Sequence, residues 1–236
     1  MTRFFLLLIF MILMMKGLFA QTLYLIPGTG ADHHLFDRLD LADYKTVHLD
    51  YIEPKPKEEF EQYISRLAER IDTTERFALI GVSLGGMIVT ELAEQLQPEA
   101  AIVIAGAKHR NELPTTYRIF RHLPVYHLIG GRTMRWSTKR LQPLFEPMDE
   151  EAEWLFKDML NAKSSAFLRA AVRWMIGWER TTYSDSIVHI HGTKDHTLPT
   201  KFITADHLIE GGGHMIVYTH ASEVNRLILN ILESDN

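Results

Sequence analysis

Short apolar runs alternate with amphipathic stretches through the first half of the chain. The runs Thr22 to Ile26, Arg76 to Val82 and Ala100 to Ala105 are dominated by apolar residues, as is typical of strands buried on both faces of a parallel sheet. Residues 58–71 and 86–96 instead place apolar side chains at helical spacing. The alternation of strands and helices predicts a parallel sheet with helices on both faces.

The alternation stops at residues 108–183, a segment rich in aromatic residues and interrupted by prolines. Helices are expected only near residues 150–159 and 164–178. An insertion of this length is too long for an ordinary connection, so we expect a helical cap or lid. The other elements expected from the pattern are strands at 45–49, 186–191 and 205–209, and a closing helix at 222–232 that Ser222 caps.

The N-terminal segment differs from the rest of the chain. Arg3 is followed by an unbroken apolar run from Phe4 to Met15, and Ala20 offers a cleavage site, as in a secretory signal. The run is shorter than the roughly 20 residues that span a membrane. We therefore expect export, with membrane contact only through this segment if it is not cleaved. A true start at Met14 or Met15 would instead leave a cytoplasmic protein.

Composition limits the organisation and the chemistry. With 236 residues, 46% hydrophobic and 23% charged, the chain fits one α/β core with an insertion. The expected division is a leader at 1–20, a core at 21–107 and 184–236, and a cap at 108–183. A net charge of -5 argues against a nucleic-acid partner. The absence of cysteine excludes disulfides, thiolate metal sites and a cysteine nucleophile.

The strand ending at Val82 runs into Gly81-Val82-Ser83-Leu84-Gly85, and a helical pattern follows at once. A sharp strand-to-helix turn around Gly-x-Ser-x-Gly is a nucleophile elbow, in which the glycines let backbones pass closely. Ser83 is therefore the candidate nucleophile. A serine hydroxyl needs a base to take its proton and a third group to orient that base.

Both partners follow late strands in the required order. Asp195 comes after the strand at 186–191, and His214 comes after the strand at 205–209. The carboxyl ends of parallel strands meet at one edge of the sheet, so both side chains should lie near Ser83. Asp206 and Glu210 are competing acids, but they fall within the last strand and on the histidine loop itself, which suits the role poorly.

The oxyanion formed in acyl transfer needs N–H donors. One should be the backbone N–H of Leu84, and the other should come from the loop Pro27-Gly28-Thr29-Gly30 after the first strand. We assign the Thr29 N–H as this second donor, with Gly30 as the alternative.

These motifs together resemble the α/β-hydrolase superfamily, and more narrowly its small capped bacterial serine hydrolases. The segments that carry the resemblance are Leu25-Ile26-Pro27-Gly28-Thr29-Gly30, Gly81-Val82-Ser83-Leu84-Gly85-Gly86-Met87, His191-Gly192-Thr193-Lys194-Asp195 and Gly211-Gly212-Gly213-His214. The resemblance implies a minimal sheet of about six mostly parallel strands. It also implies a serine hydrolase that acts on esters or thioesters without a cofactor. Pro27 departs from the family, since many relatives have a histidine at that place.

The cap aromatic residues suggest a small-molecule substrate with an apolar or aromatic acyl or alcohol group, although each could simply pack the cap onto the core. They are Trp136, Trp154, Phe156, Phe167, Trp174 and Trp178. Hydrolysis or lysis of a carbon–carbon bond by the same triad remains open, as does a non-catalytic binding module. A metal site at His189, His191 and Asp195-His196 is a further alternative, but its spacing differs from that of metallo-β-lactamase-like hydrolases. The sequence does not predict the oligomeric state.

Overall fold

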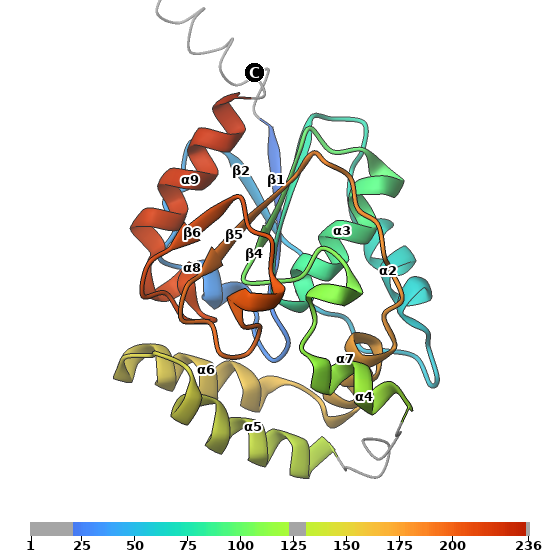
Figure 1. Cartoon of the computed structure of the whole chain (residues 1–236). Coiled ribbons are helices and arrows are strands. Elements are labelled where there is room, and N and C mark those ends of the chain that lie inside the picture. The colour runs from blue at the N-terminus through green and yellow to red at the C-terminus, as the bar shows by residue number, and fades with distance from the viewer. Residues whose placement is uncertain (1–20, 123–130, 235–236) are drawn as a thin grey trace, which may run out of the picture.

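A computed structural model describes residues 21–122 and 131–234 (Figure 1). A single sheet of six strands forms its centre, in the order β2-β1-β3-β4-β5-β6, and every neighbouring pair is parallel. The strands are β1 (Thr22–Ile26), β2 (Lys45–His48), β3 (Phe77–Val82), β4 (Ala100–Ile104), β5 (Ile187–Gly192) and β6 (His207–Ile209). The predicted α/β class and six-stranded sheet are confirmed. The predicted leader at 1–20 lies outside the described residues.

Strand register brings the functional loops to one edge of the sheet. Ile26 pairs with Gly81, Ile104 pairs with Ile190, and Gly192 pairs with Ile209. The loops after β1, β3, β5 and β6 therefore leave the sheet at the same edge, as expected for parallel strands.

Helices cover both faces of the sheet. Figure 1 shows α2 and α3 on one side of the sheet and α9 on the other. The described core helices are η1 (His33–Phe36), α2 (Phe60–Ala68), α3 (Leu84–Leu96), η4 (Thr200–Phe202), α8 (Ile216–Thr219) and α9 (Ala221–Ser234), and η2 (Arg110–Glu112) follows β4. Ser222 lies inside α9, so its prediction as the cap of this helix was wrong, and Asp206 precedes β6 rather than lying within it.

In the described part of the segment between β4 and β5, four α-helices follow η2 and run beneath the carboxyl edge of the sheet in Figure 1. They are α4 (Thr115–His122), α5 (Gly131–Phe145), α6 (Glu150–Ala162) and α7 (Ser165–Gly177). The pattern predicted α6 and α7 but missed α4 and α5, because these two helices are rich in polar and charged residues and α5 includes a proline at position 143. We call residues 108–122 and 131–183 the helical insertion.

Buried aromatic side chains hold the helical insertion against the core. The Trp174 indole N–H donates to the Glu58 carbonyl at 2.9 Å, and the Trp178 indole N–H donates to the Glu91 carboxylate at 2.7 Å. Phe167 packs on Tyr51 with ring centroids 4.6 Å apart. Across the described ranges, no helix is both long enough and apolar enough to cross a membrane.

We expect Gly85→Ala to destabilise the fold by at least about 2 kcal/mol, because an added Cβ forces backbone shifts in a close-packed region. That Cβ would lie 2.2 Å from the Ile26 carbonyl oxygen and 2.5 Å from the Pro27 carbonyl oxygen. Gly177→Ala is the control, because a Cβ there meets no atom within 4 Å. The midpoints of urea unfolding measure both effects, and an unchanged midpoint for Gly85→Ala would contradict the expected close contact.

Candidate active site

Ser83 occupies the sharp turn between β3 and α3. Its backbone has φ 55° and ψ -116°, a conformation that L-residues rarely adopt outside strained turns. Neighbouring glycines make the turn possible, because a Cβ on Gly81 would lie 2.2 Å from the Gly85 carbonyl oxygen. The backbone therefore holds the Ser83 hydroxyl at the carboxyl edge of the sheet, as in a nucleophile elbow.

His214 bridges Ser83 and Asp195. Its Nε2 lies 2.9 Å from Ser83 Oγ, and its Nδ1 lies 2.8 Å from Asp195 Oδ2. An ionised carboxylate only accepts hydrogen bonds, so His214 Nδ1 carries the proton that faces Asp195. His214 Nε2 then has a free lone pair for the Ser83 proton. The structure thus brings together the three side chains that the sequence predicted, in the order that nucleophilic catalysis requires.

The buried pair His214 and Asp195 has shifted pKa values. Burial alone lowers the pKa of His214, but the charge and hydrogen bond of Asp195, helped by the charge of Glu146, raise it above its ordinary value of 6.5. Burial alone raises the pKa of Asp195, but His214, His191 and the Leu198 N–H bring it below its ordinary value. Asp195 is therefore ionised at neutral pH and can orient the imidazole.

Asp195 and His214 lie on two adjacent loops. We call residues 193–198 the acid loop and residues 210–215 the histidine loop. The Lys194 N–H donates to the Gly212 carbonyl at 2.8 Å, and a Cβ on Gly192 would lie 2.2 Å from the same oxygen. Only glycine at position 192 allows this backbone-to-backbone approach, which fixes the distance between Asp195 and His214.

Asp195 has two further contacts, one from the acid loop and one from β5. The Leu198 N–H donates to Asp195 Oδ1 at 2.7 Å, and His191 Nε2 lies 3.4 Å from Asp195 Oδ2. His191 Nε2 also lies 2.8 Å from the Leu198 carbonyl oxygen, which requires a proton on that nitrogen. The sequence had suggested His191 only as a metal ligand, and its place against Asp195 was missed.

The loop after β1 passes directly over Ser83. A Cβ on Gly28 would lie 3.2 Å from Ser83 Cβ, and the Ala31 N–H closes the turn on the Gly28 carbonyl at 3.0 Å. Gly30 has φ 81°, and a Cβ there would meet Leu160 at 2.7 Å. Thr29 lines the cavity next to Ser83, as does Leu84. Within residues 21–122 and 131–234, the N–H groups of Thr29 and Leu84 donate to no protein group.

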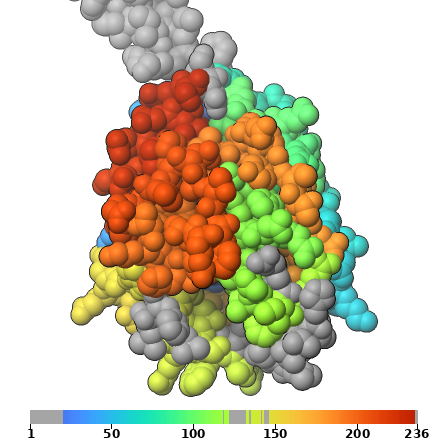
Figure 2. All heavy atoms as spheres, viewed as in Figure 1, coloured from blue at the N-terminus to red at the C-terminus, as the bar shows by residue number. Residues whose placement is uncertain are grey.

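A cavity of about 220 Å³ lies between Ser83 and the helical insertion. Its apolar wall includes four methionines, and Thr138 and Gln142 of α5 add polar groups. Among the described residues that line it there is no Asp, Glu, Lys or Arg. Figure 2 shows the yellow and yellow-green surface of the insertion at the lower end of the molecule, beneath the orange surface of the loops that follow β5 and β6.

Only one of the six cap aromatic residues that suggested a substrate pocket lines this cavity, and that residue is Phe156. Trp136 and Trp154 are 62% and 65% exposed, while the other three are buried between the insertion and the core. Methionine and aliphatic side chains instead supply most of the apolar wall.

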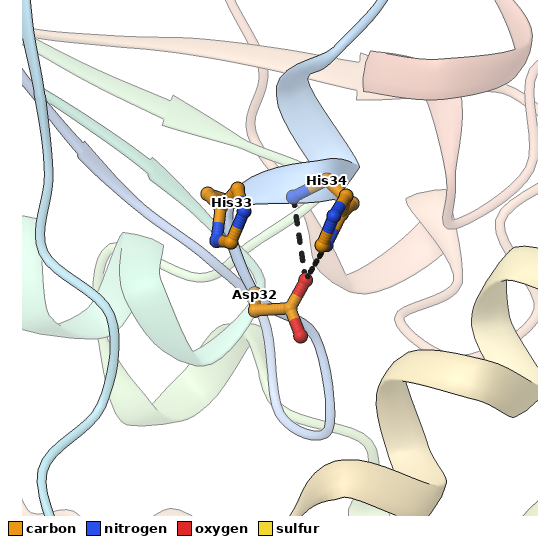
Figure 3. Close-up of side chains that lie close together, drawn as sticks. All are labelled: Asp32, His33 and His34. Atoms are coloured by element: carbon orange, nitrogen blue, oxygen red, sulfur yellow. Dashed lines mark hydrogen bonds and ion pairs between the residues drawn. The ribbon is translucent and has the colours of Figure 1, made fainter.

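Asp32, His33 and His34 form a second polar cluster, drawn in Figure 3. In the described part of the chain, they are the one group of three or more ligating side chains close enough to share a metal ion. Asp32 Oδ1 accepts from the His34 N–H at 3.3 Å and from His34 Nδ1 at 2.8 Å, as a helix cap does. Lys163 Nζ lies 3.3 Å from Asp32 Oδ2, and His33 Nδ1 lies 3.0 Å from Asp50 Oδ2. The Lys163 ammonium group would repel a metal ion at this place. The cluster is therefore explained by the role of Asp32 as the N-cap of η1.

Sequence comparison identifies a family for the chain. The model of the alpha/beta hydrolase family matches residues 23–227. No curated protein sequence matches the chain.

Many solved structures share the fold. A bromoperoxidase from Bacillus anthracis has a TM-score of 0.71 and 17% identity, over 91% of this chain and 92% of that chain. An esterase from Exiguobacterium antarcticum has a TM-score of 0.70 and 15% identity, with the same coverage of 91% and 92%. An enol-lactonase from Burkholderia xenovorans has a TM-score of 0.69 and 14% identity, again over 91% and 92%. These identities establish the fold alone, whereas the family model spans most of the sequence, so the chain belongs to the alpha/beta hydrolase family.

Proposed function

We propose that this protein is a serine hydrolase of small carboxylic esters or thioesters, with Ser83 as nucleophile, His214 as base and Asp195 as the orienting acid. The observation that carries the proposal is the bridge from Ser83 through His214 to Asp195, with contacts of 2.9 Å and 2.8 Å at the wall of a cavity. Among the structural neighbours, one is described as an esterase and another as an enol-lactonase, which also supports ester chemistry.

In the proposed reaction, Ser83 Oγ attacks the substrate carbonyl while His214 Nε2 takes the hydroxyl proton. The carbonyl oxygen becomes an oxyanion that accepts hydrogen bonds from the N–H groups of Leu84 and Thr29. Collapse of the intermediate breaks the bond to the leaving alcohol or thiol, which receives the proton from His214. Water then attacks the acyl-enzyme with His214 again as base, and this releases the acid and restores Ser83.

The cavity favours a neutral, apolar substrate group. Its described lining has no charged side chain that could pair with a substrate carboxylate or phosphate. Its volume of about 220 Å³ is small for a ligand pocket. Methionine side chains adapt to irregular apolar shapes, so a short acyl chain fits better than a long or charged one.

We expect p-nitrophenyl butyrate to be hydrolysed at least roughly tenfold more efficiently than p-nitrophenyl palmitate, because a cavity of this size excludes most of a long chain. Val172→Phe, on the cavity wall of α7, should shift the preference further toward the acetate ester. The kcat/KM values across an ester series measure both effects. Leu229→Phe on α9 is the control, because Leu229 is not among the described residues that line the cavity, and it should leave the preference unchanged. A palmitate preference in the unchanged protein would contradict the assigned pocket.

We expect kcat/KM to fall as the pH drops through the pKa of His214, because only the neutral imidazole can take the Ser83 proton. Asp195 and Glu146 raise this pKa above 6.5, so the acid limb of the profile should lie above pH 6.5. A pH series with p-nitrophenyl butyrate measures it. A rate that stays constant down to pH 5 would rule out His214 as the base.

A further inference from the structure

Glu146 is a buried carboxylate that the helical insertion places beside the candidate triad. It follows α5 and is only 4% exposed. Its Oε1 accepts from the His196 N–H at 3.1 Å and from the Thr197 hydroxyl, and its Oε2 accepts from the His214 N–H at 3.0 Å. One side chain of the insertion therefore binds both the acid loop and the histidine loop.

The backbone of the histidine loop leaves room for the Glu146 carboxylate. A Cβ on Gly213 would lie 3.2 Å from Glu146 Oε2 and 2.7 Å from Pro147 Cδ, so glycine at position 213 lets the carboxylate reach the histidine loop. In the described ranges, no Lys or Arg forms an ion pair with Glu146. A buried carboxylate without a cation is costly. An amide could not replace it without loss, because both oxygens of Glu146 accept hydrogen bonds and an amide nitrogen only donates.

The negative charge of Glu146 favours the positively charged imidazole that forms when His214 takes the Ser83 proton. The charged and titratable groups that face His214 are Asp195 on the acid loop, Glu146 on the insertion and His191 on β5. Asp195 and Glu146 both favour the protonated ring, whereas His191 is buried and has a lowered pKa.

We propose that Glu146 is a positioning residue through which the helical insertion keeps Asp195 and His214 aligned. The inference rests on the proposed hydrolase function. Glu146 fixes the backbone of His214 and the end of the acid loop, because it accepts hydrogen bonds from both.

The test compares Glu146→Gln with the unchanged protein in two assays. We expect kcat for p-nitrophenyl butyrate to fall roughly 10- to 100-fold, because small misplacements of catalytic groups have effects of this size. The acid limb of the rate of fluorophosphonate labelling at Ser83 should move to lower pH, since the variant removes a negative charge near His214. A purely structural role would lower stability without moving this limb. Glu150→Gln, at an exposed position of α6, is the matched control and should change neither quantity.

Glu146→Asp is the second variant. It keeps the charge but shortens the side chain, so we expect a reduced kcat with a smaller movement of the acid limb. A folded Glu146→Gln protein with unchanged kcat and an unchanged limb would overturn the inference. Failure of both variants to fold would also overturn it, because Glu146 would then serve the fold as a whole. Absence of labelling in the unchanged protein would instead reject the hydrolase proposal itself.

Discussion

Ser83→Ala is expected to abolish labelling by a fluorophosphonate and to lower kcat/KM for p-nitrophenyl butyrate by roughly 10⁴- to 10⁶-fold, the range seen when a serine nucleophile is removed. The substitution deletes the hydroxyl oxygen that lies 2.9 Å from His214 Nε2, so no acyl-enzyme can form. Alanine has the same backbone cost as serine at φ 55°, so the free energy of unfolding should change little.

Mass spectrometry of the labelled protein and an ester assay measure the two effects. Ser65→Ala is the matched control, because Ser65 is an exposed serine on α2 whose hydroxyl donates to the Glu61 carbonyl at 2.8 Å. It should keep full labelling. A Ser83→Ala protein that still reacts with the probe would place the nucleophile elsewhere.

The sequence predicted the sheet and the three candidate side chains for one physical reason. Strands of a parallel sheet end at a common edge, so residues that follow β3, β5 and β6 must meet there. Ser83, Asp195 and His214 follow these strands, and the structure brings them within hydrogen-bond distance. The glycines at 81 and 85 marked the sharp turn in the sequence because few other residues permit it.

The helical insertion was harder to predict. Glu146 lies 68 positions from His214 along the chain, and its approach depends on the paths of α5 and α6 rather than on any strand. The polar composition of α5 and its proline at position 143 hid this helix, so nothing in the sequence directed Glu146 toward the core. The role of the cap aromatic residues stayed open between pocket and packing for a related reason. Periodicity identifies an apolar face, but it does not say whether that face meets a cavity or another helix.

In the proposed hydrolase, the core and the helical insertion have different roles. The core supplies Ser83, His214, Asp195 and one side of the cavity, and the insertion supplies the other side and the Glu146 contact. In the proposed function, both parts therefore limit substrate size, whereas the core carries the chemistry.

Asp195→Asn is expected to lower kcat/KM by roughly 10³- to 10⁴-fold while the protein remains folded. The asparagine oxygen can still accept from the Leu198 N–H, which donates to Asp195 Oδ1 at 2.7 Å. The amide nitrogen then faces His214 Nδ1 in place of the carboxylate oxygen. Since an amide NH₂ only donates, His214 must carry its proton on Nε2, where it opposes the Ser83 hydroxyl instead of accepting its proton.

Glu210→Gln separates this effect from a general loss of charge near the site, because Glu210 is an exposed acid on the histidine loop itself. It should keep kcat/KM within about twofold, since exposed charges interact weakly with buried groups. The same ester assay and a urea unfolding curve serve both variants. If Glu210→Gln lost activity and Asp195→Asn kept it, the orienting acid would be Glu210. The 2.8 Å contact between Asp195 and His214 makes the opposite result the expected one.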